Sequence, residues 1–312
     1  MENDKTTGVV VAVDGTEGSM GALRYGVAEA QARGCEVRFV HVAPRFDVSG
    51  SIMRDAKKQI EKTGLSLLAQ AEQQAKALSD HVEVSTQLRI GSRIQEILAA
   101  GSHAQLLVLG RPAHTDTQRL VFGSTTGAVV GRSIVPTSVI PTDWVADPTP
   151  ARVVVGLRWA EHTDELLQSA FNAAIANSAS VDVVHAWKMP DPYIDKLQEP
   201  HYATAWMAAG TEMVEEALAP WRVRYPDIPV NVNVVHDHPA RALLVAAEGA
   251  TLLLLLRRRA SKLLGSHLGT TARVVLGSAP SPVTVLPHSQ DGSDAVKRQL
   301  DLDLERSGVP LK

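Results

Sequence analysis

Residues 106–141 read LLVLGRPAHTDTQRLVFGSTTGAVVGRSIVPTSVIP. The stretch opens with an apolar run that Gly110 ends, continues through a polar loop, and reaches Gly123 and three hydroxyl residues at the expected start of a helix. This order can hold a phosphate, because backbone N–H groups and the positive end of a helix dipole converge on one anion. An ordinary turn with Ser124 as helix N-cap would produce the same letters. The stretch alone leaves both interpretations open.

Short apolar runs alternate with helical segments throughout the first 141 residues. Such runs are typical of strands buried on both faces, and the segments between them place apolar residues at helical spacing. Strands are predicted over residues 8–13, 36–42, 82–89, 106–109 and 137–140, helices around residues 19–30, over 59–78 and 93–100 and from Ser124, and a loop over 45–55. This order predicts an α/β fold with a doubly wound, Rossmann-like five-stranded parallel sheet and helices on both faces.

The same pattern begins again near residue 151, at an offset of 144 to 146 residues. The run VDVVHAW (181–187) matches VRFVHVA (37–43), and PVTVLP (282–287) matches PTSVIP (136–141). Internal repeats decide a fold more firmly than any local feature. We predict a tandem duplication: a first domain over residues 1–141, a linker over 142–150, a second domain over 151–287 and a polar C-terminal tail over 288–312.

The chain of 312 residues has a formal net charge of −3 and a single cysteine, Cys35. A slightly acidic chain is not expected to bind nucleic acid, and a lone cysteine excludes an intrachain disulfide, which fits a reducing cytoplasm. The start, MENDKTT, lacks an apolar signal segment, and the apolar run over 252–256 is far too short to span a membrane. We expect a cytoplasmic protein that binds neither nucleic acid nor membrane.

The spacing of glycines in the opening stretch resembles that of the universal stress protein family. Nucleotide-binding members carry Gly-x2-Gly-x9-Gly-Ser/Thr after the fourth strand, and Gly110, Ala113 and Gly123-Ser124 reproduce this spacing with alanine in the second place. Together with the Asp-Gly that ends the first strand, the pattern resembles a tandem universal stress protein over most of the chain. The resemblance implies that the fifth strands of the two halves pair within the chain, and that two chains could associate further as a homodimer.

The resemblance also implies that ATP, AMP or ADP, with Mg²⁺ as a companion ion, binds at the carboxyl ends of the central strands in the first half. An open parallel sheet binds ligands at that edge in any family. The implied roles are adenosine contact for Asp14, adenine contact through the backbone for Val42, ribose and phosphate contact for Leu109 and Gly110, and phosphate binding for Gly123, Ser124 and Thr125, with Ala113 in the same loop.

Two positions of this pattern decide how the site is interpreted. At Ala113 a methyl group is unfavourable if the backbone needs positive φ or must approach a phosphate, and harmless if the position only needs to be small. Leu256 occupies the position of Gly110 in the second half, so the scaffold is expected to accept a large residue there. We therefore interpret Gly110 as evidence for a ligand rather than a need of the fold, and Ala113 as the residue on which the prediction of nucleotide binding could fail.

The second half is predicted to have lost the nucleotide site. It carries Arg158, Ala186, Leu256 and Arg259 where the first half has Asp14, Val42, Gly110 and Ala113, and it keeps only Gly269-Thr270-Thr271. An arginine cannot accept a hydrogen bond from ribose. Arg158 and the three arginines at 257–259 could gather at one cleft and bind an anion. Alternatively, they are solvated or pair with acidic residues of the other half.

The sequence shows no convincing catalytic constellation. Ser124 has no evident His/Asp partner, and no carboxylate pair for Mg²⁺ stands out, so any ATP turnover is expected to be slow. His41 and His185 end equivalent strands; they could titrate at a cleft there, but we expect core or hydrogen-bonded histidines. Three functions remain open: a nucleotide-binding stress-response regulator with an unidentified protein partner, a nucleotide-free interaction module, and a slow ATPase.

Overall fold

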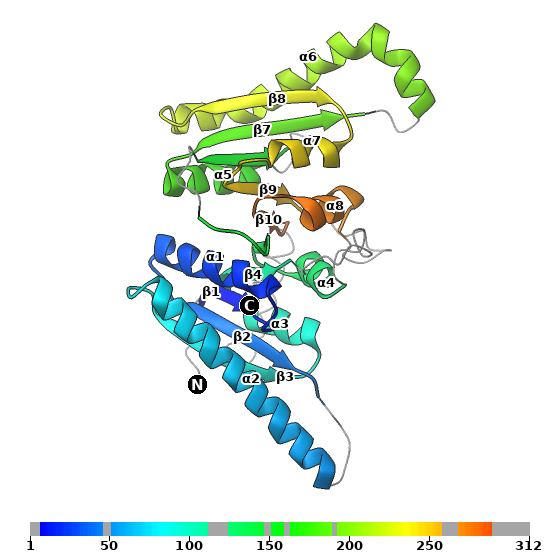
Figure 1. Cartoon of the computed structure of the whole chain (residues 1–312). Coiled ribbons are helices and arrows are strands. Elements are labelled where there is room, and N and C mark those ends of the chain that lie inside the picture. Colours follow the sequence, from blue (N-terminus) through cyan, green and yellow to red (C-terminus); the bar gives the residue numbers. More distant parts are fainter. Residues whose placement is uncertain are drawn as a thin grey trace, which may run out of the picture.

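The computed structural model describes residues 7–45, 51–111, 124–146, 151–158, 163–188, 192–257 and 268–288 (Figure 1). The first half contains β1 (Thr7–Ala12), α1 (Gly18–Arg33), β2 (Val37–Ala43), α2 (Ser51–Leu78), β3 (Val84–Ile90), α3 (Arg93–Gly101), β4 (Ala104–Gly110), α4 (Ser124–Arg132) and β5 (Thr137–Ile140). The second half contains β6 (Arg152–Gly156), α5 (Asp164–Asn177), β7 (Ser180–Trp187), α6 (Pro192–Arg224), β8 (Val230–His236), α7 (Pro239–Ala246), β9 (Leu252–Leu256), α8 (Thr270–Ser278) and β10 (Val283–Leu286).

The ten strands of the described residues form one sheet in the order β3-β2-β1-β4-β5-β10-β9-β6-β7-β8. Within each half the strands pair in parallel, as predicted. A single antiparallel pair, β5 with β10, joins the halves. The predicted pairing of the fifth strands within the chain is therefore present, and the two parallel sheets are continuous rather than separate.

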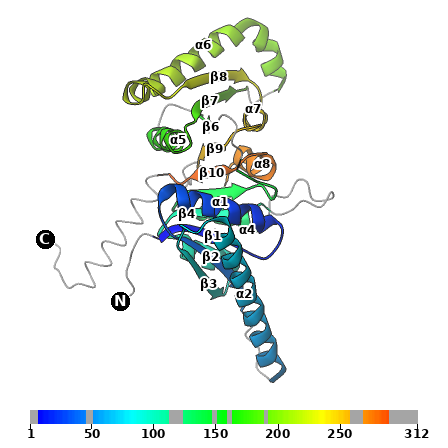
Figure 2. The same cartoon turned by 60° about the vertical axis from the view of Figure 1, so that its left-hand side comes forward.

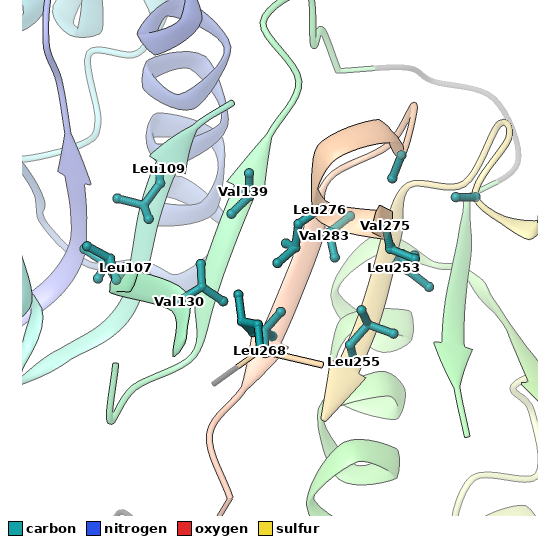
Figure 3. Close-up of a cluster of buried hydrophobic side chains, with 14 of the residues drawn as sticks. Leu107, Leu109, Val130, Val139, Leu253, Leu255, Leu268, Val275, Leu276 and Val283 are labelled. Carbon is teal, nitrogen blue, oxygen red and sulfur yellow. The ribbon is translucent and has the colours of Figure 1, made fainter. Parts of the chain in front are cut away.

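Helices cover both faces of the sheet, because successive strand residues point to opposite sides. On one face α1 and α2 cover the first half, and α5 and α6 cover the second. On the other face α3, α4, α7 and α8 enclose a single apolar cluster that continues across the join (Figure 3). Leu109 and Val139 of the first half belong to it together with Leu276 and Val283 of the second. The two halves therefore share one core on this face.

Helix α2 begins at Ser51, so the predicted loop over 45–55 is wrong from Ser51 onward. Figures 1 and 2 show the start of α2 projecting beyond the sheet. Residues 55–59 are exposed there. A projecting helix has no face to bury, so it lacks the apolar periodicity on which the prediction depended.

Part of the predicted linker is docked rather than free. Arg24 of α1 donates from Nε to the carbonyl oxygen of Trp144 (2.8 Å) and from Nη2 to that of Thr142 (3.2 Å). The Trp144 ring packs edge-on against Tyr25, with ring centroids 5.1 Å apart. These contacts fix the direction in which the chain leaves β5.

The centre of the join is a buried pair of hydroxyl groups. Ser138 of β5 lies opposite Thr284 of β10, and their oxygens are 2.6 Å apart. The two residues occupy equivalent positions of the duplicated sequence, 146 residues apart. The join therefore has approximate two-fold symmetry about this pair.

Two equivalent arginines cross the join in opposite directions. Arg111, just after β4, donates from Nη1 to the carbonyl oxygen of Ala279, 2.5 Å away at the end of α8. Arg257, just after β9, donates from Nη1 to the carbonyl oxygens of Val130 (3.1 Å) and Ser133 (2.6 Å) at the end of α4. A cation is favoured at both acceptors, because helix C-terminal ends carry partial negative charge. Each half thus holds the other by a charge-assisted hydrogen bond.

We expect Arg257→Met to lower the free energy of unfolding by about 2–3 kcal/mol, because two buried carbonyl oxygens lose a charged donor. Urea denaturation of the full chain measures this change. Arg241→Met is the control: its side chain is 77% exposed, and we expect an effect of less than about 0.5 kcal/mol. Equal effects of the two substitutions would contradict the structural role of Arg257.

Candidate functional site

A cavity of about 410 Å³ opens at the carboxyl edge of the first-half strands. Its described walls come from β1, β2 and β4, the segments that follow them, and the first residues of α1, α3 and α4. This edge of a parallel sheet is where ligands bind in open α/β folds. The volume lies within the range of about 300–1,000 Å³ that small-molecule sites occupy.

The structure brings most of the predicted site residues together. The residues lining the cavity include Asp14, Val42, Leu109, Gly110 and Thr125. Ser124 is the first residue of α4, directly before Thr125. Ala113 and Gly123 lie outside the described residues, so the interpretation of Ala113 stays a prediction.

The alternation of strand side chains explains why these residues share one cavity. Val42 and Leu109 belong to the core cluster under α3 and α4. Arg111 comes two residues after Leu109. Asp14 comes two residues after Ala12, which packs against the same cluster. Residues two apart on a strand face the same side. The ends of β1, β2 and β4 therefore present their last side chains to one space.

Asp14 is fixed by a turn of its own. Its Oδ1 accepts hydrogen bonds from the Thr16 N–H (3.0 Å) and from Thr16 Oγ1 (2.6 Å), while Gly15 between them has φ +79°. Aspartate and glycine are suited to such a turn, since the carboxylate bonds the backbone two residues on and glycine tolerates positive φ. Oδ2 makes no hydrogen bond within the described part of the chain, so it can accept one from a ligand.

Gly110 has a packing reason for being glycine, which corrects our interpretation from the sequence. A Cβ at this position would lie 2.1 Å from the carbonyl oxygen of Gly18 and 3.2 Å from Ser19 Cα, at the start of α1. The close approach is therefore between two parts of the chain itself. The expectation that the scaffold accepts a large residue at this position is therefore wrong for the first half, where the fold itself needs a residue without a side chain.

Positive charge surrounds the cavity. Helices α1, α3 and α4 begin at its wall, and their N-terminal ends favour an anion. Arg93 and Arg111 contribute guanidinium groups, against the single carboxylate of Asp14 among the described lining residues. Burial lowers the pKa of Arg111, and the Asp143 carboxylate opposes that shift. Thr126, the third of the hydroxyl residues noted in the opening stretch, also lines the cavity. Arg93 and the buried Ser19 line it too and were missed from the sequence; the available signal was their place at helix starts.

The second half does not assemble the same edge. Arg158 is exposed after β6, and Leu256 ends β9 where Gly110 ends β4. Arg257 is buried in the join, where it donates to the carbonyl oxygens of Val130 and Ser133. The proposed gathering of arginines is therefore wrong for Arg257, whereas residues 258 and 259 lie outside the described ranges.

The histidines that end the equivalent strands are hydrogen-bonded, as expected, and His41 also lines the cavity. His41 Nδ1 lies 2.8 Å from the carbonyl oxygen of Val13, and His185 Nδ1 lies 3.1 Å from that of Leu157. Because a carbonyl oxygen only accepts, each Nδ1 carries the proton. Each ring also packs against a glycine of a helix. A Cβ added to that glycine would lie 3.0 Å from the ring Cδ2 in the first half and 3.2 Å from it in the second half.

Aromatic rings fill part of the second-half edge that is open in the first half. The first half has a further cavity of about 260 Å³ between the ends of β2 and β3 and α2. The equivalent ends of β7 and β8 carry Trp187 and His236, stacked with ring centroids 4.2 Å apart, and Trp206 of α6 packs edge-on at 5.0 Å. The same part of the sheet edge is therefore open in the first half and filled by aromatic rings in the second half.

No group of three His, Cys, Asp or Glu side chains that could hold a metal ion is found within the described ranges. Among the described helices, none combines the length and the apolar character needed to cross a membrane.

A family model described as the universal stress protein family matches residues 6–141 and again 151–287. A universal stress protein of Mycobacterium tuberculosis (strain ATCC 25618 / H37Rv) is 29% identical over 297 residues, covering 91% of this chain and 98% of that protein. One from Mycolicibacterium smegmatis (strain ATCC 700084 / mc(2)155) is 26% identical over 292 residues, covering 89% and 96%. The crystal structure of a universal stress protein from Archaeoglobus fulgidus DSM 4304 is similar with a TM-score of 0.68 at 18% identity, over 91% of this chain and 99% of that one.

We expect Gly110→Ala to lower the free energy of unfolding by about 1–3 kcal/mol without any ligand, because the methyl group overlaps the backbone of α1. Urea denaturation of nucleotide-free protein measures this. A variant with unchanged stability that had lost only ligand binding would instead restore the interpretation of Gly110 as evidence for a ligand.

Proposed function

Because the chain belongs to the universal stress protein family, we propose that its first half binds an adenine nucleotide, ATP or the related ADP or AMP. One observation carries the proposal: Asp14, Val42, Leu109, Gly110 and Thr125, implied independently as site residues, line one cavity of suitable size. In this proposal the chain is a cytoplasmic stress-response regulator, and the bound nucleotide biases which surface it offers to a partner protein.

The positions of the lining residues support one orientation of the nucleotide. The adenine would lie at the end of β2, against the backbone of Val42, and the ribose at the end of β1, where the free Oδ2 of Asp14 can accept from a hydroxyl group. The phosphates would lie beyond β4, towards Ser124 and Thr125 at the start of α4. A helix N-terminus stabilises phosphate there.

The chemistry of the cavity favours binding over turnover. Mg²⁺ would arrive with the triphosphate, but Asp14 is the single carboxylate among the described lining residues, and its Oδ1 is engaged by Thr16. Fast phosphoryl transfer needs the nucleophile and the metal to be positioned together. We therefore propose that any hydrolysis of ATP is slow.

The second half serves in this proposal as a scaffold. Arg158 cannot accept from ribose, and Leu256 presents a side chain where Gly110 presents backbone. We propose the domain limits expected from the repeat, 1–141 and 151–287, with 142–150 as the linker and 288–312 as a tail.

A nucleotide-free interaction module remains the second candidate, and Gly110 favours it. Since packing against Gly18 explains the glycine, its presence no longer requires a ligand. The two candidates differ in whether the purified chain binds nucleotide at all.

We expect ATP to raise the melting temperature of the purified chain, since a ligand that binds only the folded state stabilises it. Isothermal titration calorimetry then gives the dissociation constant. Asp14→Ala should weaken ATP binding about tenfold or more, because the acceptor for the ribose is lost. Absence of both a melting shift and a calorimetric signal at millimolar ATP would refute nucleotide binding and leave the interaction module.

The duplication offers a matched control for this experiment. Thr125→Val removes a hydroxyl from the first-half cavity with little change of volume, and Thr271→Val makes the same change at the equivalent position of the second half. Weakened ATP binding is expected from the first substitution alone. An equal effect of both would contradict the asymmetry between the halves.

A further inference from the structure

Arg111 belongs to the cavity and to the join between the halves. Its side chain lines the cavity, and its Nη1 donates to the carbonyl oxygen of Ala279, 2.5 Å away in the second half. Its backbone is also held, since its N–H donates to the Ile140 carbonyl oxygen (2.8 Å) and its own carbonyl oxygen accepts from Thr142 Oγ1 (3.3 Å). The guanidinium group of Arg111 therefore belongs both to the wall of the cavity and to the join between the halves.

The acceptor in the second half holds this cation electrostatically. Ala279 is the C-cap of α8 and is fully buried. The C-terminal end of a helix carries the negative end of its dipole, so a guanidinium is stabilised there. The second half thus fixes a positive charge at the wall of a cavity whose described lining residues all belong to the first half.

The equivalent arginine of the second half is buried more deeply in the join. Arg257 is only 6% exposed, and its Nη1 reaches two carbonyl oxygens. Arg111 is half-buried and reaches one. No further hydrogen bond of the Arg111 guanidinium occurs among the described residues, so N–H groups remain for an anion in the cavity.

We propose that Arg111 recognises the phosphate groups of the nucleotide, and that the second half holds Arg111 in position to do so. The inference rests on the proposed function, since it concerns the same cavity. A guanidinium presents a planar fork of donors that matches phosphate oxygens, so one edge can bind Ala279 while other N–H groups bind the ligand. An arginine already held loses less conformational freedom on binding than a free one.

Two consequences follow for the whole chain. The cavity prefers phosphorylated nucleotide to nucleoside, because adenosine offers nothing for the guanidinium to bind. The second half, although it lacks its own version of the site, completes the site of the first half. A duplicated chain would keep such a half even after its own ligand chemistry is gone.

Calorimetric titration of the full chain with adenosine, AMP and ATP tests the inference. For Arg111→Gln we expect ATP affinity to fall about tenfold or more, since a hydrogen bond to a charged group is lost, and adenosine affinity to stay within about twofold. Arg111→Lys keeps the charge but not the planar fork of donors, so its ATP affinity should lie between that of the unsubstituted chain and that of Arg111→Gln. Arg132→Gln, an equal change of charge at an exposed position in the last turn of α4, is the control and should change neither affinity.

The outcomes separate this inference from the proposed function. If the unsubstituted chain binds neither adenosine nor ATP, both fail together. If it binds ATP but Arg111→Gln binds ATP equally well, or loses adenosine and ATP to the same extent, nucleotide binding stands and the phosphate role of Arg111 is overturned.

Amide hydrogen exchange supplies the readout for the second half. ATP should slow exchange in α8, because the phosphate and the Ala279 carbonyl oxygen then hold the same guanidinium from both sides. Adenosine should leave α8 unchanged, as should ATP added to Arg111→Gln. Protection of α8 that is equal for adenosine and ATP would show that the second half does not respond through Arg111, and would overturn its part in the site.

Discussion

The antiparallel pairing of β5 with β10 is the contact on which the rest of the molecule depends. It turns two five-stranded parallel sheets into one sheet and covers the edge that each would otherwise expose. The Ser138–Thr284 hydroxyl pair at its centre sets an approximate two-fold symmetry, which carries the core under α3, α4, α7 and α8 across the join. The same symmetry brings the carboxyl end of β4 close enough to α8 for Arg111 to reach Ala279.

The two halves share one scaffold but differ at its carboxyl edge. In the first half, Gly110 lets the start of α1 approach β4, and a cavity with one carboxylate and two guanidinium groups opens beside them. In the second half, Leu256 takes the place of that glycine, and Arg257 is buried against the end of α4. The two halves therefore share the symmetry of the backbone, whereas the side chains at the carboxyl edge differ between them.

Much of the candidate site could be predicted from the sequence because it depends on local order. Strand ends in a parallel sheet meet at one edge, so Asp14, Val42 and Leu109 could be placed together without coordinates. Two features could not be predicted in this way. The need for glycine at position 110 comes from α1, more than 90 residues earlier, and Arg93 lines the cavity only because α3 crosses the same face.

From the sequence it was possible to predict the α/β class, the duplication, the parallel strands and the edge at which a ligand would bind, because period-two and helical patterns are local and repeat along the chain. Which side chains hold the fold together depends on packing between distant segments. The carbonyl acceptors of Arg111 and Arg257 carry no sequence signal, since every residue has a carbonyl group, and only the packing of α4 and α8 at the join selects those of Ala279 and Ser133.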